Sequence, residues 1–538
     1  MIVYGSRGSD LALTQTRWVA ERVKAETGED YRIEVMVTTG DKIQDRPLAG
    51  IGVKGLFTKE LEDALRDGSI DAAVHSLKDL PVEDPAGITL GAVPARVDPR
   101  DVLVTRTDVL GDTAQPWRTL RSGATIGTSS PRRSLAATTA RADLQPSDIR
   151  GNVPTRVDKA RRADYDAVLL AAAGLERLDQ DLSGLVTETL PVRSFTPAPG
   201  QGALGVQCRA GDERVRSALQ KIHDEVTARC VAAERSVLLG LGGGCSMPLG
   251  VLVDPVQGRY RIRAALFGGD PNAALREAAI GADPAELAAN VVSRWCSLMG
   301  APLQGRQIGT IRPDGERTGL TAALAIAGAG VTSLAWTRSE ALAVERDELE
   351  AVISRDTLAF TSTRAVRHFV AACDAYGLSP LDHPAVAVGA TTASELVQCG
   401  FVNVTAASGR GGEALAKFCD EAGLGSIGMP CAQKRHAGFE RLASDRGADV
   451  LALPVYRLLE VAGAEAEIPS ELDAFLYSSP SAVEAWLRVT RGRTNVCAIA
   501  IGSTTCDSLR SNGFGTIVSL SRPTPSALIE AVLDGISA

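Results

Sequence analysis

The sequence predicts a multidomain α/β protein, and three observations lead to this fold class. The chain has 538 residues, whereas a single hydrophobic core seldom grows beyond about 250 to 300 residues. Hydrophobic residues make up 45% and charged residues 23% of the chain, a composition typical of folded domains. Short apolar strands alternate with helical patterns, which is typical of parallel or mixed sheets covered by helices.

The alternation begins at the amino terminus. Strands are expected at residues 2–4, 31–38 and 70–74, and helices at residues 10–26 and 57–66. Arg7 then lies in the first strand-to-helix turn, where Ser9 or Asp10 is placed to cap the helix. The third strand leads directly into His75-Ser76-Leu77-Lys78-Asp79.

The same alternation continues through residues 124–207, with strands expected at 124–127, 165–171 and 203–207. After the first of these, Thr128-Ser129-Ser130-Pro131 supplies hydroxyl caps and a first-turn proline for a helix that runs through Arg141. Arg132 and Arg133 fall in its first turn, where amides, helix dipole and guanidiniums could converge on one carboxylate. Residues 121–162 contain nine Lys or Arg against three Asp. Arginine suits two-point recognition of carboxylates or phosphates, so a local anion site is predicted.

Composition and charge exclude several classes of protein. The net charge of −8 and the aromatic content of 4% argue against a general binder of nucleic acid or of acidic membranes. The ten cysteines show no Cys-x-x-Cys pair and no spacing typical of a metal site, so we expect neither a disulfide framework nor a bound metal. No leader-like segment and no run of about 18 apolar residues is present. We therefore expect a cytoplasmic protein that does not span a membrane.

One thiol has an unusual sequence environment. Cys245 stands in Gly242-Gly243-Gly244-Cys245-Ser246-Met247-Pro248, where the glycines leave its sulfur little side-chain cover. The sulfur is therefore a candidate for a covalent attachment, although a lone cysteine is more often a small buried hydrophobe. Arginines in loop-like motifs favour a polyanionic ligand close to this sulfur. These arginines are Arg7, Arg132, Arg133, Arg150 and Arg156.

From residue 1 to about residue 300, the ordered motifs resemble hydroxymethylbilane synthase, also called porphobilinogen deaminase. The motifs are Lys54-Gly55-Leu56-Phe57, His75-Ser76-Leu77-Lys78-Asp79, Asp98-Pro99-Arg100-Asp101, Gly127-Thr128-Ser129-Ser130 with Arg132-Arg133, Arg150-Gly151-Asn152-Val153, Gly200-Gln201-Gly202-Ala203 and the Cys245 loop. The resemblance implies two periplasmic-binding-protein-like α/β domains, at 1–97 with 197–216 and at 98–196. It also implies a small α+β domain at 217–300 that carries the cysteine.

The resemblance also implies roles for individual residues. Cys245 would hold a dipyrromethane cofactor through a thioether, and Asp79 would be catalytic, stabilising positive charge as ammonia leaves porphobilinogen. The expected cofactor-binding residues are Lys78, Ser129, Arg132 and Arg133. The expected substrate-binding residues are Arg7, Ser9, Lys54, Ser76, Thr128, Ser130, Arg150 and Arg156. The alternative role of Asp79 is a surface aspartate paired with Lys78.

After about residue 300 the chain repeats itself. The segment 360–366 recurs at 476–483, and the segment 386–392 recurs at 499–505, which indicates two duplicated α/β halves. With Ile311-Arg312-Pro313 and Pro454-Val455-Tyr456-Arg457, these turns resemble uroporphyrinogen-III synthase from Gly305 to the carboxyl end. That resemblance implies two domains, one at 305–337 with 457–538 and the other at 338–456. The predicted fold is thus a duplicated two-domain α/β arrangement.

The second resemblance implies cyclisation of hydroxymethylbilane to uroporphyrinogen III with inversion of the last ring. Tyr456 is the expected proton donor. The expected substrate-binding residues are Thr361, Ser362, Thr391, Ser478, Ser479, Thr504 and Thr505, each of which could equally be a helix cap. The predicted protein is a monomer that makes tetrapyrroles from porphobilinogen without a nucleic-acid partner. The alternative is a hydroxymethylbilane synthase fused to a non-catalytic regulatory or structural α/β repeat.

Overall fold

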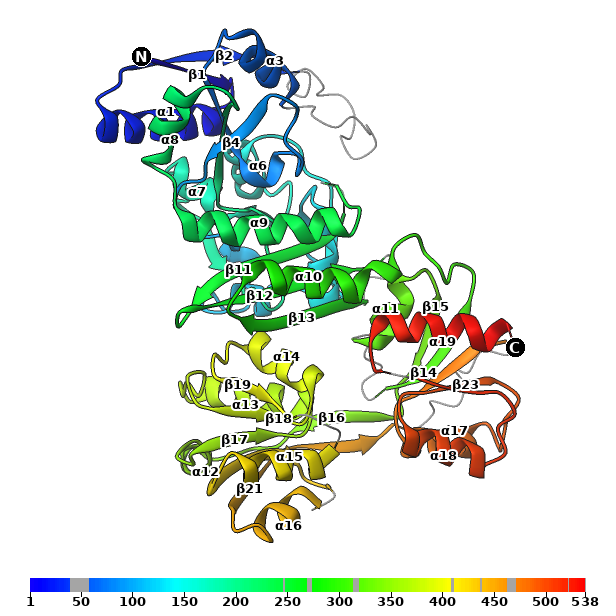
Figure 1. Ribbon diagram of the computed structural model, residues 1–538. Helices are drawn as coiled ribbons and strands as arrows, with labels where there is room; N and C mark the ends of the chain where they lie inside the picture. Colours follow the sequence, from blue (N-terminus) through cyan, green and yellow to red (C-terminus); the bar gives the residue numbers. More distant parts are fainter. Residues whose placement is uncertain are drawn as a thin grey trace. The chain divides into compact units, whose positions relative to one another are not determined.

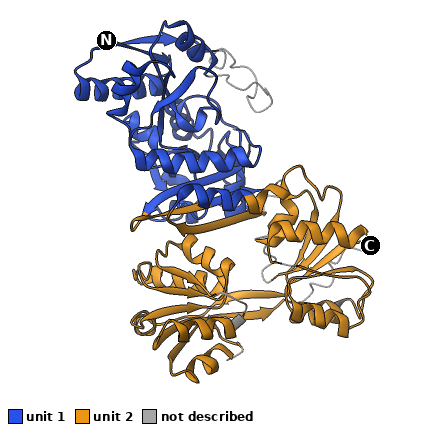
Figure 2. Cartoon of the chain, viewed as in Figure 1, with its two compact units in different colours: residues 1–255, 264–267, 283–292 blue, residues 256–263, 268–282, 293–538 orange. Residues whose placement is uncertain are grey.

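A computed structural model describes residues 1–38, 58–244, 247–268, 273–312, 319–407, 411–435, 438–461, 471–520 and 522–537 (Figure 1). The chain forms two compact units, which Figure 2 shows in different colours. Unit 1 comprises residues 1–255, 264–267 and 283–292, and unit 2 comprises residues 256–263, 268–282 and 293–538. Each unit contains several sheets, so the mixed α/β multidomain class is confirmed.

The first sheet of unit 1 joins segments that are far apart in the sequence. Its strand order is β2 (Tyr31–Met36), β1 (Ile2–Arg7), β3 (Ala72–Ser76), β10 (Leu204–Arg209) and β4 (Ile88–Ala92). The first three strands are parallel, and β10 runs antiparallel to both neighbours. Helices α1 (Asp10–Thr27) and α8 (Glu213–Gln220) contribute to one apolar cluster on this sheet, and α3 (Lys59–Asp67) contributes to another.

The second sheet of unit 1 carries most of the predicted anion site. Its order is β7 (Gln145–Ser147), β6 (Thr125–Gly127), β8 (Ala167–Ala171), β5 (Asp101–Thr105) and β9 (Val186–Thr189). Strand β6 is parallel to β7 and β8, whereas β5 is antiparallel to β8 and β9. The helices that connect these strands are α4 (Pro116–Thr119), α5 (Pro131–Ala140), α6 (Val153–Arg161) and α7 (Ala172–Arg177).

Helix α9 (Glu225–Gly240) follows the first sheet and precedes a three-stranded sheet of β11 (Leu249–Val256), β12 (Arg259–Phe267) and β13 (Ala274–Gly281). Helix α10 (Pro284–Trp295) comes next. The boundary between the two units runs through this part of the chain. Within the described residues, no helix is both long enough and apolar enough to cross a bilayer.

Unit 2 contains two further sheets. One is parallel throughout, in the order β15 (Gly330–Leu334), β14 (Gln307–Ile311), β22 (Ala474–Tyr477), β23 (Cys497–Ala500) and β24 (Ile517–Ser519). The other has the order β16 (Thr337–Ala341), β21 (Asp449–Glu460), β20 (Ser426–Ala432), β17 (Thr357–Phe360), β18 (Ala385–Ala387) and β19 (Val404–Ala406). Among the described strands of that sheet, only β16 and β21 pair in antiparallel fashion. These two strands also run between the two parts of unit 2 (Figure 1).

The element order of unit 2 is repeated. The series β17, α13 (Thr363–Ala375), β18, α14 (Ala390–Cys399) and β19 recurs as β22, α17 (Pro480–Val489), β23, α18 (Ser503–Ser511) and β24. The remaining helices are α11 (Leu320–Ile326), α12 (Arg346–Ile353), α15 (Gly411–Glu421), α16 (Gly438–Ser444) and α19 (Pro525–Ser537). In each repeat, the helix that follows a strand starts at the carboxyl end of that strand, where open α/β sheets usually bind ligands.

Candidate active sites

The start of α5 forms as its sequence predicts. Ser130 caps the helix by accepting a hydrogen bond from the Arg133 amide, and Pro131 occupies the first turn, where its missing N–H costs nothing. This fixes Arg132 and Arg133 beside the first residue of β5. Asp101 Oδ2 lies 2.7 Å from Arg132 Nη1, and Asp101 Oδ1 lies 2.9 Å from Arg133 Nε. One carboxylate therefore accepts hydrogen bonds from both arginines.

This trio is buried and keeps a net positive charge. Asp101 is fully buried, and the two guanidiniums are nearly so. Burial opposes ionisation of Asp101, but the charges of Arg132 and Arg133 outweigh it and hold the pKa of the carboxyl far below its usual range. One negative charge cannot neutralise two guanidiniums. Arg132 Nε is also buried without a hydrogen-bond partner within the described structure, so the pair still favours an anion.

A glycine turn connects this trio to the first sheet. Gln201 donates from Nε2 to Asp101 Oδ1 over 2.9 Å and accepts at Oε1 from Lys78 Nζ over 3.4 Å. The turn needs glycine on both sides of Gln201. Gly202 has a φ of +87°, and a Cβ there would stand 2.8 Å from the Val97 carbonyl oxygen. The turn thus brings an amide side chain between the two sheets.

Lys78 and Asp79 lie in the short 3₁₀ helix η1 (Leu77–Asp79) after β3. Burial lowers the pKa of the partly exposed Lys78 ammonium to about 8, although the Asp79 charge opposes this shift. Asp79 is exposed, and its charge also opposes the burial-driven fall in the pKa of Arg133. Arg235 of α9 fixes this segment by donating to the carbonyl oxygens of Leu77 and Leu80.

Two further arginines of the predicted site, Arg150 and Arg156, add positive charge close to Arg133. Arg156 Nη2 donates to Ser129 Oγ over 3.2 Å, and Arg156 Nε donates to the Gly151 carbonyl over 2.8 Å. Burial lowers the pKa of Arg156, and the charges of Arg133 and Arg150 act in the same direction. The loop around the start of α6 and the start of α5 therefore contribute positive charge to one region.

Several hydroxyl residues predicted to bind substrate have structural partners. Ser9 accepts a hydrogen bond from the Ala12 amide as the cap of α1, and Ser76 hydrogen-bonds to Gln15. Thr128 is buried and accepts from the Ser130 amide over 3.2 Å. Each hydroxyl therefore makes a hydrogen bond within the protein.

Arg7 is the last residue of β1. Its charge acts with burial, the main cause, to lower the pKa of the His75 imidazole to about 4. Arg7 and His75 therefore lie near the ends of the neighbouring parallel strands β1 and β3. Two predicted site residues, Lys54 and Cys245, lie outside the described residues.

Residue patterns missed four groups that organise the site around Asp101. Asp101 and Gln201 stand in motifs that the sequence singles out. Their contacts are not visible in the sequence, because Arg132 lies 31 positions from Asp101 and Gln201 lies 100 positions from Asp101. Arg235 carries no motif at all. Arg177, at the end of α7, donates to the Gly202 carbonyl over 2.7 Å, and burial lowers its pKa to about 10. In the sequence, Arg177 is marked only by its place after an apolar strand.

In unit 2, the two repeated hydroxyl turns cap helices. Ser362 Oγ accepts from the Ala365 amide over 3.1 Å at the start of α13, and Ser479 Oγ accepts from the Ala482 amide over 3.3 Å at the start of α17. The preceding residues differ in exposure, since Thr361 is exposed and Ser478 is half-buried. Capping is therefore observed in both repeats.

Tyr456 lies at an irregularity in its sheet. The pairing of β20 with β21 shifts register between Cys431 and Ala432, so that Ala432 pairs with Tyr456. Such bulges redirect side chains and often occur beside active sites. The Tyr456 hydroxyl oxygen lies 3.3 Å from Ser362 Oγ, and only 5% of the residue is exposed. Two residues predicted for one site are thus in contact.

The paired threonines of the second repeated turn point in different directions. Thr391 and Thr504 are exposed, whereas the residues that follow them, Thr392 and Thr505, are buried. A helical start turns successive side chains by about 100°, so one threonine of each pair faces the core. Thr391 and Thr504 remain the accessible candidates for binding substrate.

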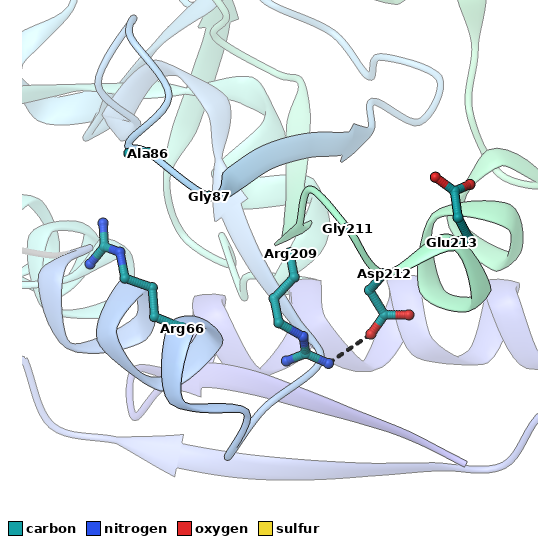
Figure 3. A pocket seen from close by; sticks show the side chains of 7 residues that line it. All are labelled: Arg66, Ala86, Gly87, Arg209, Gly211, Asp212 and Glu213. Atoms are coloured by element: carbon teal, nitrogen blue, oxygen red, sulfur yellow. Dashed lines mark hydrogen bonds and ion pairs between the residues drawn. The ribbon is translucent and has the colours of Figure 1, made fainter.

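Away from these residues, unit 1 has a shallow surface hollow (Figure 3). Arg209 in this hollow binds Asp212 and Asp71, each over 2.7 Å, so its charge is already neutralised. None of the predicted site residues that the structure describes lines the hollow. Its lining residues are Arg66, Ala86, Gly87, Arg209, Gly211, Asp212 and Glu213. Among the residues with described positions, no cluster of His, Cys, Asp and Glu is arranged to hold a metal ion.

Three family models match consecutive parts of the chain. The model "Porphobilinogen deaminase, dipyromethane cofactor binding domain" matches residues 2–217. The model "Porphobilinogen deaminase, C-terminal domain" matches residues 228–293, and "Uroporphyrinogen-III synthase HemD" matches residues 320–530. Together they cover most of the chain in the order that the motifs predict.

Two individual relatives agree with the porphobilinogen deaminase matches. Porphobilinogen deaminase of Brevibacillus brevis is 43% identical over 289 residues, which is 53% of this chain and 91% of the relative. That of Bacillus mycoides is 43% identical over 296 residues, 54% of this chain and 93% of the relative. A solved uroporphyrinogen III synthase mutant of Thermus thermophilus is 21% identical, with a TM-score of 0.33, and covers 43% of this chain and 99% of its own. The chain therefore belongs to the porphobilinogen deaminase family between residues 2 and 293 and, between residues 320 and 530, to the uroporphyrinogen-III synthase family.

Proposed function

We infer that the residues described above act in two consecutive steps of tetrapyrrole biosynthesis, because the chain fuses a porphobilinogen deaminase to a uroporphyrinogen-III synthase. The fused chain is a bifunctional enzyme. Its first part polymerises four porphobilinogen molecules to hydroxymethylbilane with release of ammonia, and its second part closes the product to uroporphyrinogen III. The observation that carries this conclusion is the succession of both families in one chain.

The arginine group fits a cofactor and a substrate that carry acetate and propionate side chains. The first family match is to a dipyrromethane-binding domain, and Arg132, Arg133 and Lys78 supply positive charge that Asp101 offsets only in part. We assign these three and Ser129 to the bound dipyrromethane, with Cys245 as its covalent anchor. When bound, that group would supply the nucleophilic pyrrole carbon to which each new unit is added. Arg7, Arg150 and Arg156 are assigned to carboxylates of incoming units.

Asp79 is the proposed catalytic group of the first reaction. Ammonia leaves a porphobilinogen carbon with its bonding electron pair, and positive charge develops on the pyrrole ring. A carboxylate placed beside the pyrrole N–H stabilises that charge as it forms. Asp79 is suited to this role because it is exposed and its charge acts on Lys78 and Arg133, the residues assigned to the bound dipyrromethane.

Tyr456 is the proposed proton donor of the second reaction. The substrate hydroxyl leaves with the electrons of its C–O bond and takes the Tyr456 proton, which forms water. A carbon–carbon bond then closes the macrocycle, and the proton lost from the closing ring restores Tyr456. The Ser362 hydroxyl, 3.3 Å away, can donate to the phenolate in the meantime. The exposed hydroxyls at the helix starts of both repeats would bind the substrate carboxylates.

We also propose the domain limits that the resemblances imply. In the first part these are 1–97 with 197–216, 98–196 and 217–300. In the second part they are 305–337 with 457–538 and 338–456. The grouping of strands supports them, because β10 returns to the first sheet and β14 pairs with β22 across a long sequence gap.

Intact mass spectrometry of the protein as expressed tests the covalent anchor. The wild-type chain should carry an excess mass equal to a dipyrromethane, and Cys245→Ser should lack both this excess and the ability to consume porphobilinogen. Cys296→Ser is the matched control, because Cys296 is an exposed free cysteine outside the proposed site. An adduct that persists in Cys245→Ser and disappears in Cys296→Ser would overturn the assignment.

A further inference from the structure

Helix α13 contacts Tyr456 at two points. At the start of the helix, Ser362 Oγ approaches the Tyr456 hydroxyl. Six residues later, the His368 ring lies parallel to the Tyr456 ring, with 5.1 Å between the centroids and 10° between the planes. One helix therefore holds the hydroxyl of this tyrosine and also covers its ring.

The backbone at Tyr456 does not by itself define the direction of the side chain. The register shift against β20 occurs at this residue, and Pro454, two positions earlier, has no N–H to donate to the sheet. A hydrogen bond to the hydroxyl fixes the position of one atom but allows the ring to tilt about it. A parallel ring on one face removes that tilt, since stacked aromatic rings attract beyond simple burial.

We propose that His368 is a positioning residue for uroporphyrinogen III formation, which acts by fixing the ring plane of Tyr456. The inference rests on the proposed role of Tyr456 as proton donor. His368 is only partly buried, and its ring lies against Tyr456, which belongs to the same apolar cluster as Phe360 and Phe369. The His368 ring therefore covers one face of the Tyr456 ring at the edge of this cluster.

The arrangement also explains the double use of Ser362. Its Oγ accepts the Ala365 amide proton as a helix cap, which leaves the hydroxyl proton available to Tyr456. When Tyr456 gives its proton to the leaving hydroxyl, the Ser362 hydroxyl donates to the phenolate oxygen. This hydrogen bond keeps good geometry only while the Tyr456 ring stays in the plane that His368 sets.

Four single-site variants of the full chain test the proposal. His368→Ala removes the ring, His368→Phe keeps a flat ring, His368→Leu keeps volume without a plane, and Tyr456→Phe removes the proton donor. Porphobilinogen consumption serves as an internal control, because the first reaction uses other residues. The synthase kcat and KM and the ratio of type III to type I product are then measured, with the melting temperature as a check on folding.

We expect His368→Ala to lower the synthase kcat by about 10- to 100-fold with little change in KM, as for a misplaced catalytic group. His368→Phe should restore most of the rate and His368→Leu should not. The double variant His368→Ala with Tyr456→Phe should be no slower than Tyr456→Phe alone, because both changes remove the same function.

Three results would overturn the proposal. The first is a wild-type kcat for His368→Ala, and the second is an equal kcat for His368→Leu and His368→Phe. The third is a double variant whose fold-loss in kcat equals the product of the fold-losses of the two single variants. A wild-type rate for Tyr456→Phe would instead reject the proton-donor role itself. A wild-type chain that yields only the type I isomer would reject the synthase function.

Discussion

Asp101→Asn is expected to destabilise unit 1 by about 3 to 5 kcal/mol, because it leaves two buried guanidiniums without their shared counter-charge. Asp101 is fully buried and accepts hydrogen bonds from Arg132, Arg133 and Gln201. Asparagine keeps the size of the side chain but removes its charge and one acceptor oxygen. Hydrogen exchange of peptides from residues 98–216 in the intact chain measures the change locally, which avoids the assumption of two-state unfolding.

A surface ion pair provides the matched control for this variant. Asp143 pairs with Arg141 at a more exposed position, and Asp143→Asn should leave the exchange rates close to those of the wild-type chain. Equal exchange rates in Asp101→Asn and Asp143→Asn would show that the buried trio is not a structural anchor.

Asp79→Asn is expected to lower porphobilinogen consumption by about 100- to 1000-fold, the usual cost of removing one group that stabilises charge in a transition state. The fold should be unaffected, because Asp79 is exposed at the end of η1. The rate is measured as ammonia release by protein that carries the covalent adduct, which excludes a failure to assemble the cofactor.

Asp84→Asn is the control for charge in the same segment, since Asp84 is exposed five residues later. It should keep close to the wild-type rate. If both variants lost activity equally, the effect would come from the net charge of the loop and not from a specific carboxylate.

Local structure was well predicted by the sequence because its signals are local. The helix expected at residues 10–26 is α1 at Asp10–Thr27 with Ser9 as its cap, and the helix expected after Ser130 begins at Pro131. Strand limits were less accurate. The strand expected at 31–38 ends at Met36, and the strand expected at 70–74 is β3 at Ala72–Ser76, because strand ends are set by pairing with distant segments.

Partners of site residues were much harder to predict. The arginine-rich segment predicts an anion site with unpaired positive charge. In the structure, however, Arg121 forms an ion pair with Asp166, and Arg132 and Arg133 form ion pairs with Asp101. Both aspartates lie outside that segment, so counting charges within it overestimated the free positive charge. The motifs include Asp101 and Gln201 but do not indicate that these two side chains form a hydrogen bond.

In unit 2 the sequence shows the repeat, but it does not show that the two halves make different contacts. Hydroxyl residues recur in both halves, yet only the first half places one against Tyr456 among the described contacts. The stacking of His368 on Tyr456 has no sequence signal, because residues 88 positions apart are brought together by the packing of α13 on β21.

The central claim is that one chain performs both consecutive reactions, and isomer analysis of its product tests this most directly. Purified full-length protein is incubated with porphobilinogen alone, and the uroporphyrinogen formed is separated into type I and type III isomers. The fused families predict mainly type III product, without any added synthase. Type I product alone, converted to type III only when a separate uroporphyrinogen-III synthase is added, would contradict the claim and leave residues 320–530 as a non-catalytic repeat.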